Sequence, residues 1–352
     1  MVLIASIVVV IGAGSVGFAV GYGVWGHRTP VVVPPATTPT TSSVTVSAVA
    51  AKVDPELVDV NVTLGYETAK AAGTGMVITS TGTVVTNNHV IEGATAVQVT
   101  DVGTGAVYTA SVVGYDIGAD VAVLQLQGAS GLKKVAFASS SAVRVGERVV
   151  AIGNAEGLGG TPSAAGGTVT ALNQSISAED EVSGATEHLT GLFGTNAAIE
   201  SGDSGGPLVN TAGQVIGMNT ASSSGFAFAQ SASEGYAIPS HAIEIVRGQI
   251  TAGILSSAVH IGATAFLGVH VVALNQSGAA VVQVEMGTPA TAVGLTPGDV
   301  IDTVGGHAVR TPTTLSAVMQ TYKPGTTVSL GWHGATGVTE TGSVTLGSGP
   351  PA

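Results

Sequence analysis

The residues with the clearest chemical potential lie in the run Glu200–Leu208, which reads Glu-Ser-Gly-Asp-Ser-Gly-Gly-Pro-Leu. Glycines stand two positions before and one position after Ser204, and glycine permits tight turns that a side chain would hinder. Such a turn can present a hydroxyl and aim neighbouring backbone N–H groups at one point, as hydrolysis by an alcohol nucleophile requires. We therefore predict Ser204 as a nucleophile. We place an oxyanion hole on the segment Gly202, Asp203 and Ser204, with the N–H groups of Gly202 and Ser204 as its donors.

Two upstream segments supply a base and a carboxylate. His89, within Thr86–Ile91, is expected to end an apolar strand, and Asp120 immediately precedes the apolar run Val121–Leu126. Alone, such a histidine would be a structural residue and such an aspartate a turn residue. With Ser204 they follow the order His–Asp–Ser, in which the imidazole takes the proton of the hydroxyl and the carboxylate fixes the imidazole tautomer. The sequence thus predicts His89, Asp120 and Ser204 as a catalytic triad.

Short apolar runs separated by glycine-rich turns fill the chain between about residues 50 and 240, which favours β-barrels or a sandwich. The predicted strands are Gly75–Ile78, Thr83–Thr86, Ala106–Val113, Val121–Leu126, Val149–Ile152, Gly167–Ala171, a strand around Leu208, and Gln214–Met218. A helix is expected to follow, with Ser240 as its N-cap, with Ile243, Val246 and Ile250 on one face, and with Gly253 at its end.

The sequence resembles the HtrA/DegP group of PDZ-containing serine proteases, most nearly secreted actinobacterial members of the PepA type. The resemblance covers roughly residues 48–352, and its carriers are Thr86–Ile91, Asp120–Leu126, Glu200–Leu208, Gly235–Pro239 and Ala265–Val269. It implies an all-β fold, a chymotrypsin-like double β-barrel with the triad in the cleft between the barrels, followed by a PDZ domain. In this barrel class the base of the specificity pocket lies six residues before the nucleophile. That position is Ala198, followed by Ile199, so we expect small or medium aliphatic side chains before the scissile bond.

One departure from the group concerns Asp203. Many members have asparagine before the nucleophile, and in digestive relatives an aspartate there pairs with a new N-terminus after zymogen cleavage. This chain has no obvious cleavage site before residue 60. Zymogen activation is therefore not part of the expectation.

The C-terminal part, residues 260–350, is predicted as the PDZ domain. Phe266, Leu267, Gly268 and Val269 resemble its carboxylate-binding loop, because successive N–H groups in a glycine-containing turn can hold a terminal carboxylate. The segment Gly294–Ile301 matches the internal part of such domains, and Thr314–Tyr322 is expected to be the helix that borders the groove.

The N-terminal segment differs from the rest. Residues Val2–Trp25 carry no charge over 24 positions, and a helix of that length spans the ~30 Å hydrocarbon layer. We predict a transmembrane signal anchor over residues 1–26, with a cleaved signal peptide as the alternative. A Pro/Thr-rich tether over 27–49 and a protease domain over 50–253 follow.

Composition excludes several classes of function. Only 9% of residues are charged, the net charge is −12, and ten Lys plus Arg are scattered, so nucleic acid is not expected as a partner. The absence of cysteine removes disulfides and thiolate chemistry. The histidines show no metal-binding spacing, so neither a metal nor another cofactor is expected.

The expected function is that of a serine endopeptidase cleaving misfolded or exported proteins outside the cytoplasm. A cell-membrane location, with the catalytic domain on the outer side, follows from the predicted anchor, and a secreted form remains open. The PDZ domain is expected to bind C-terminal peptides of substrates or regulators. The alternative is a chaperone or peptide-binding scaffold with minor proteolysis. The triad favours the protease, because a scaffold gains nothing from it.

Overall fold

The computed structural model describes residues 45–351, apart from 66–68, 155–158, 181–185, 221–225, 229–233, 255, 257, 275–277 and 335–336. The predicted anchor over 1–26 lies outside the described residues, as does most of the predicted tether. No described helix has the length and apolar character that a membrane crossing requires. Helix α1 (Val46–Val53) begins within the range expected for the tether, with the Thr45 hydroxyl capping its first turn.

The first barrel follows α1 and the short 3-10 turn η1 (Asp54–Glu56). Its strands are β1 (Leu57–Leu64), β2 (Ala69–Val77), β3 (Thr83–Thr86), β4 (Ala96–Asp101), β5 (Val107–Asp116) and β6 (Val121–Leu126). They pair antiparallel in the order β5-β4-β1-β2-β3-β6, and pairing of β5 with β6 closes the barrel. Its interior is filled by β-branched and leucine side chains such as Val60, Val84 and Leu124, all fully buried.

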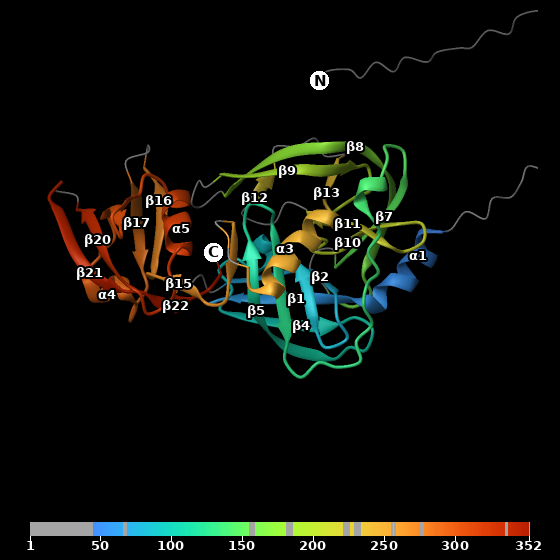
Figure 1. Cartoon of the computed structure of the whole chain (residues 1–352), viewed down its shortest axis with the longest axis horizontal. Coiled ribbons are helices and arrows are strands. Elements are labelled where there is room, and N and C mark those ends of the chain that lie inside the picture. Colours follow the sequence, from blue (N-terminus) through green and yellow to red (C-terminus); the bar gives the residue numbers. More distant parts are fainter. Residues whose placement is uncertain are drawn as a thin grey trace, which may run out of the picture. The chain divides into compact units, whose positions relative to one another are not determined.

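The second barrel repeats this plan. Its strands are β7 (Arg148–Gly153), β8 (Ser163–Asp180), β9 (Thr186–Thr195), β10 (Pro207–Asn210), β11 (Val215–Thr220), β12 (Phe226–Phe228) and β13 (Gly235–Pro239). The order is β12-β8-β7-β10-β11-β13-β9, and β8 also pairs with β9 to close the ring. Figure 1 shows the long β8–β9 pair along one side of this barrel.

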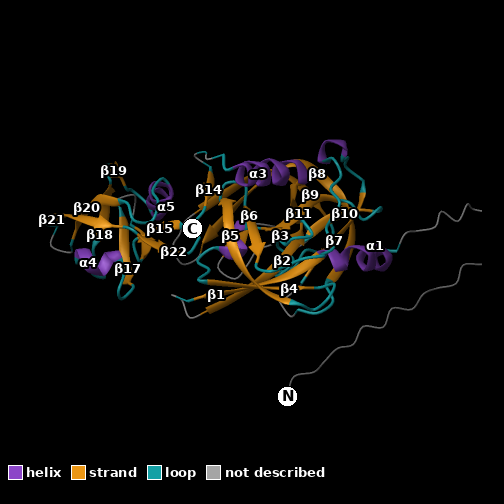
Figure 2. Cartoon of the chain, turned by 60° about the horizontal axis from the view of Figure 1, so that its bottom comes forward, coloured by secondary structure: helices purple, strands orange, loops and turns teal. Residues whose placement is uncertain are grey.

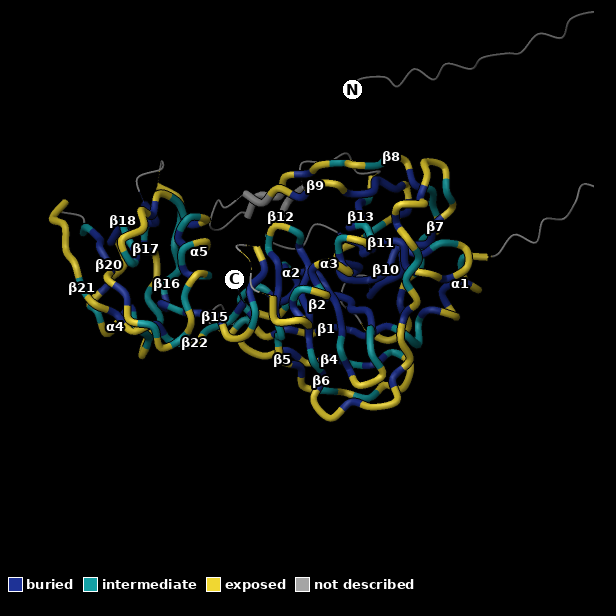
Figure 3. The backbone as a smooth tube through the Cα atoms, viewed as in Figure 1, coloured by how far each residue is buried: buried dark blue, intermediate teal, exposed yellow. Residues whose placement is uncertain are grey.

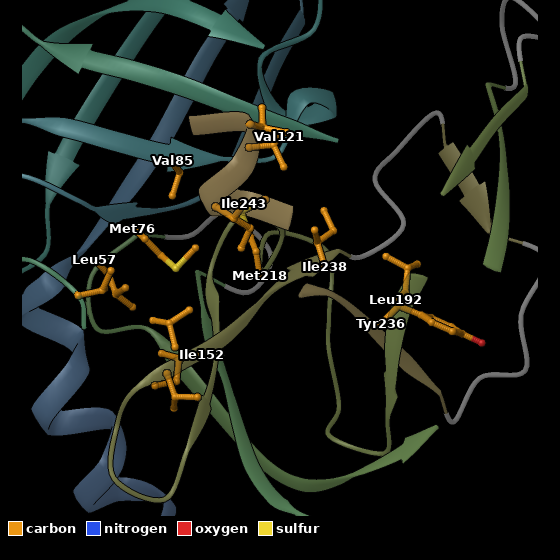
Figure 4. Close-up of a cluster of buried hydrophobic side chains, with 14 of the residues drawn as sticks. Leu57, Met76, Val85, Val121, Ile152, Leu192, Met218, Tyr236, Ile238 and Ile243 are labelled. Carbon is orange, nitrogen blue, oxygen red and sulfur yellow. The ribbon is translucent and has the colours of Figure 1, made fainter. Parts of the chain in front are cut away.

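A separate apolar cluster joins the two barrels. It takes Leu57, Met76 and Val121 from the first barrel and Ile152 and Met218 from the second. Figure 4 shows these side chains together with Ile243 of helix α3 (Ser240–Ala252). Because protein interiors pack at crystal-like density, this cluster fixes the two barrels against each other.

Helix α3 carries the predicted apolar face, with Ile243, Val246 and Ile250 buried. It contacts β5 and β6 of the first barrel and β11 and β13 of the second, and Figure 2 shows it lying over both. Gly253 ends it in the left-handed conformation. The N-cap prediction was one residue too late: Pro239 is the cap, and the Ser240 hydroxyl donates instead to the carbonyl of Ala138.

The C-terminal domain has its own core. Its strands are β15 (Thr264–Phe266), β16 (Val269–Ala273), β17 (Ala279–Val284), β18 (Val300–Val304), β19 (His307–Ala308), β20 (Thr327–His333), β21 (Thr339–Thr345) and β22 (Gly347–Gly349). Helices α4 (Pro289–Val293) and α5 (Pro312–Gln320) accompany the sheet, α5 within two residues of the predicted boundaries. Leu315, Leu330 and Trp332 are among its buried core residues. Figure 3 shows buried stretches of this domain's strands in dark blue.

The connection between these domains forms part of the first barrel. Strand β14 (Val259–Ile261) pairs antiparallel with the end of β5, matching Val259 to Asp116. The ring of His260 stacks on buried Tyr115 with centroids 5.0 Å apart, and the Tyr115 hydroxyl bonds that of Thr264 at 3.1 Å. Between the predicted end of the protease domain at Gly253 and the predicted start of the PDZ domain at residue 260, the chain therefore enters an ordered strand at Val259.

Candidate active site

His89 and Asp120 form a buried pair. His89 lies in the short helix α2 (Asn88–Ile91), directly after β3, rather than at the end of a strand as its sequence context indicates. Its Nδ1 is 2.9 Å from Oδ2 of Asp120 and 3.1 Å from Oδ1. The His89 backbone N–H also donates to Oδ1 at 3.1 Å. The side chains are 6% and 2% exposed, so water does not compete for these contacts.

The Asp120 carboxylate is held by further donors. The Asn87 amide donates to its Oδ2 at 2.9 Å and to the backbone carbonyl of Asp120 at 2.9 Å. The Thr220 hydroxyl, at the end of β11 in the second barrel, donates to Oδ2 at 3.2 Å. Asp120 itself has φ of +51°, a left-handed conformation that aspartate adopts more readily than most residues. The turn and these donors together aim the carboxylate at His89.

The nucleophile loop depends sterically on its glycines. Gly202 and Gly205 have φ of +95° and +84°. A Cβ on Gly205 would lie 2.0 Å from the carbonyl oxygen of Thr74, and one on Gly206 would lie 2.2 Å from that of Ile152. The glycine run is therefore a requirement of close packing, because no side chain fits at Gly205 or Gly206.

Hydrogen bonds fix the path of that loop. The N–H of Asp203 donates to the carbonyl of Glu200 at 3.0 Å, and the N–H of Gly206 donates to that of Asp203 at 2.9 Å. The Asp203 N–H is thus engaged within its own turn. Gly202 and Ser204 are therefore the candidate oxyanion donors within the predicted segment. Ser204 is 3% exposed. Its carbonyl accepts the Thr74 N–H of the first barrel at 2.8 Å, which brings the loop beside β2.

The Asp203 carboxylate is buried against neutral donors. Its Oδ2 accepts the Glu200 N–H at 2.9 Å, and its Oδ1 accepts the Ser163 hydroxyl at 3.3 Å. Burial is the main cause that raises the pKa of Asp203 to about 6, while the bonds from Glu200 and Ser163 oppose the rise. The carboxylate therefore braces the nucleophile loop.

The residues predicted for the specificity pocket lie on the approach to that loop. Ala198 is exposed and Ile199 is half-buried. A Cβ on Gly235, at the start of β13, would lie 2.8 Å from the Ile199 Cδ1 atom. Because Gly235 has no side chain, Ile199 can occupy this space. Ile199 therefore gives the predicted specificity pocket an aliphatic side.

The predicted carboxylate loop joins β15 to β16. The carbonyl of Leu267 accepts the Ala290 N–H at 2.8 Å, and the carbonyl of Gly268 accepts the Glu285 N–H at 2.9 Å. A trans peptide points its N–H opposite to its carbonyl. The N–H groups of Gly268 and Val269 therefore each point away from the partner that binds the carbonyl of the same peptide unit. Successive N–H groups in such a turn suit a terminal carboxylate.

Sequence reasoning assigned no role to several residues that support the site. They are Thr74, Asn87, Asn154, Ser163 and Thr220. Asn87 stood within the histidine motif, but Thr74 and Thr220 are single threonines in strands, and Asn154 and Ser163 lie more than 40 residues from the nucleophile. Their roles come from tertiary contacts, so no local pattern could have identified them.

The raised pKa of Asp203 predicts a specific pH dependence of stability. Between about pH 4 and 6 the unfolded chain releases this proton while the folded chain retains it, so the free energy of unfolding should fall as pH rises. Asp203→Asn keeps an acceptor for the Glu200 N–H and cannot ionise, so its urea midpoint should fall less across this window. The pKa of Asp59 is also raised to about 6 by burial, so adding Asp59→Asn should flatten the profile further. An unchanged slope in Asp203→Asn would contradict the assignment.

Comparisons with known proteins agree with this architecture. Residues 73–218 match the trypsin-like peptidase domain family, and residues 265–333 match the PDZ domain family. The serine protease PepD of Mycobacterium tuberculosis is 33% identical over 320 residues, covering 86% of this chain and 66% of that protein. The periplasmic serine endoprotease DegP of Escherichia coli K12 is 35% identical over 276 residues, covering 74% and 54%.

A solved structure of the HtrA-type protease AlgW with a tripeptide aligns with a TM-score of 0.50 and 27% identity, covering 88% of this chain and 98% of that one. The chain spans between about half and two thirds of the length of the curated relatives named above. The finer likeness to PepA-type members stays a prediction. With both domain families in the expected order, the chain belongs to the HtrA/DegP-like family of trypsin-like serine proteases that carry a PDZ domain.

Proposed function

We propose that this protein is a serine endopeptidase in which Ser204, His89 and Asp120 act as the catalytic triad. The observation that carries the proposal is the buried His89–Asp120 pair at 2.9 Å, beside a glycine-dependent loop that bears Ser204. Fold alone would not identify the chemistry, since one fold hosts many functions. The site supports a serine endopeptidase because a nucleophile, a base and a buried carboxylate are all present.

The proposed mechanism needs Nδ1 of His89 to donate its proton to Asp120, because a carboxylate that acts as the acceptor of the pair leaves the imidazole as the donor. The opposite nitrogen, Nε2, then has a lone pair and serves as the base for the Ser204 hydroxyl. Attack on a peptide carbonyl places negative charge on its oxygen, which the N–H groups of Gly202 and Ser204 stabilise. His89 next protonates the leaving amine, and water repeats the sequence to release the acyl group.

The proposal for substrates and location is supported by the family and by the sequence. Relatives are named as periplasmic endoproteases, and this chain begins with an uncharged segment and a Pro/Thr-rich stretch. We propose that the enzyme works outside the cytoplasm on unfolded or exported proteins. The single-pass membrane anchor over 1–26 remains part of this proposal, and protease shaving of intact cells tests on which side the catalytic domain lies.

Removal of the nucleophile should abolish cleavage. Ser204→Ala should lower the rate of casein hydrolysis by about 10⁶-fold, to background, and His89→Ala should be similarly severe. A fluorophosphonate probe should label the wild type and not Ser204→Ala. Ser201→Ala, in the same loop with an exposed side chain, is the matched control and should retain labelling. Substantial activity in Ser204→Ala would refute the triad.

The pocket should select aliphatic residues. Ala198 and Ile199 offer no carboxylate, and burying an unpaired Lys or Arg side chain is costly. Mass spectrometry of casein fragments should therefore show Val, Ala or Leu before the cleaved bond. Ala198→Asp should shift the preference toward Lys and Arg, since it supplies a counter-charge. Dominant cleavage after Lys or Arg in the wild type would contradict this pocket.

The PDZ domain should require a free C-terminus. Each charge-assisted bond contributes about 1.5–3 kcal/mol, so a hydrophobic peptide amide should bind about tenfold or more weakly than its free acid. Fluorescence anisotropy of both peptides on the whole protein measures this. Gly268 has φ of +90°, and a Cβ there would lie 2.3 Å from the Thr288 side chain. Gly268→Ala should therefore lose peptide binding while Ser204 labelling persists. Equal binding of acid and amide would sink the loop assignment.

A further inference from the structure

Thr74 lies where the first barrel opens toward the nucleophile loop. Strand β2 pairs with β3 only at Met76 and Val77, so the edge of β2 that faces away from β1 has no strand beside it at Thr74. The N–H of Thr74 instead donates to the carbonyl of Ser204 at 2.8 Å, and its carbonyl accepts the Thr86 hydroxyl at 2.7 Å. Thr74 is fully buried. The nucleophile loop thus takes the position of a missing neighbouring strand.

The side chain of Thr74 makes a second contact with the same loop. Its hydroxyl donates to the carbonyl of Gly202 at 2.8 Å and accepts the N–H of Asn154 at 2.8 Å. Because a backbone N–H can only donate, the bond from Asn154 leaves the hydroxyl proton for Gly202. The direction of the bond to Gly202 is therefore fixed.

The bond controls one peptide unit. The peptide between Gly202 and Asp203 has its carbonyl held by Thr74 and its N–H held by the carbonyl of Glu200 at 3.0 Å. This unit separates the peptide that carries the Gly202 N–H from the one that carries the Ser204 N–H. Gly202, with φ of +95°, would otherwise allow it to rotate at little steric cost. A rotation there would move the two oxyanion donors apart.

We propose that Thr74 is a positioning residue that locks the oxyanion hole, through its hydroxyl bond to the Gly202 carbonyl. The inference rests on the proposed function, because it assigns Gly202 and Ser204 as oxyanion donors. Thr74 touches no reacting atom. It holds the donors where the transition-state oxygen will lie, so its loss affects the chemical step more than substrate binding.

The test compares Thr74→Val with Thr74→Ser on a peptide substrate with leucine before the scissile bond. Valine keeps the shape and the branched carbon but cannot bond Gly202 or Asn154, whereas serine keeps the hydroxyl. Thr74→Val should lower kcat by about 10²-fold with KM within about threefold, and Thr74→Ser should stay within about threefold of wild type. A peptide boronate, which mimics the tetrahedral intermediate, should lose affinity in Thr74→Val by a similar factor.

A matched control separates this role from general destabilisation. Thr83→Val removes a half-buried hydroxyl from β3 that bonds Thr79 and Gln125 and does not contact the nucleophile loop. It should leave kcat unchanged. If Thr74→Val fails to fold, Thr74→Cys replaces it: the thiol has similar shape but donates weakly, so kcat should still fall relative to Thr74→Ser.

Defined outcomes overturn the inference. They are a kcat within threefold of wild type in Thr74→Val, a loss confined to KM, or an equal loss in Thr74→Ser. Each would show that the hydroxyl does not set the geometry of the donors. A wild type whose Ser204 takes no fluorophosphonate label would instead refute the proposed function, so the two failures are distinguishable.

Discussion

The site depends on one constraint, which is that its parts come from two barrels that must be held in register. His89 and Asp120 belong to the first barrel, and Ser204 to the second. Among the described residues, the polar contacts that join the barrels at the site come from backbone and hydroxyl groups: the Thr74 N–H donates to the Ser204 carbonyl, and the Thr220 hydroxyl donates to Asp120. Such short bonds tolerate little displacement, and catalytic geometry requires the same precision.

The apolar cluster between the barrels makes that register possible. Leu57, Met76, Ile152 and Met218 are fully buried there, and α3 contacts both barrels from outside. Close packing resists sliding of one barrel past the other. With 9% charged residues, the chain relies on packing and on threonine, serine and asparagine bonds for this precision. Buried neutral donors also avoid the desolvation cost that ion pairs would incur.

Local sequence patterns predicted individual strands, but they could not predict the tertiary contacts. Strands β3 and β6 were predicted to the residue, because alternating apolar runs with glycine turns are local signals. His89 was misplaced onto a strand, since a single helical turn after β3 leaves no periodic pattern. The bond from Thr74 to Gly202 joins distant segments, so no spacing rule could reveal it.

The segment that connects the protease and PDZ domains makes a tertiary contact that its short length does not predict. A short connection could let the PDZ domain move freely, yet β14 extends the first barrel by pairing with the end of β5. A Cβ on Gly114 would lie 2.5 Å from the His260 carbonyl, so that approach requires glycine. Asp116, opposite Val259, accepts the Ala119 N–H at 3.0 Å within the turn that delivers Asp120. The strand that leads to the PDZ domain therefore pairs with Asp116, whose carboxylate holds the turn that precedes Asp120.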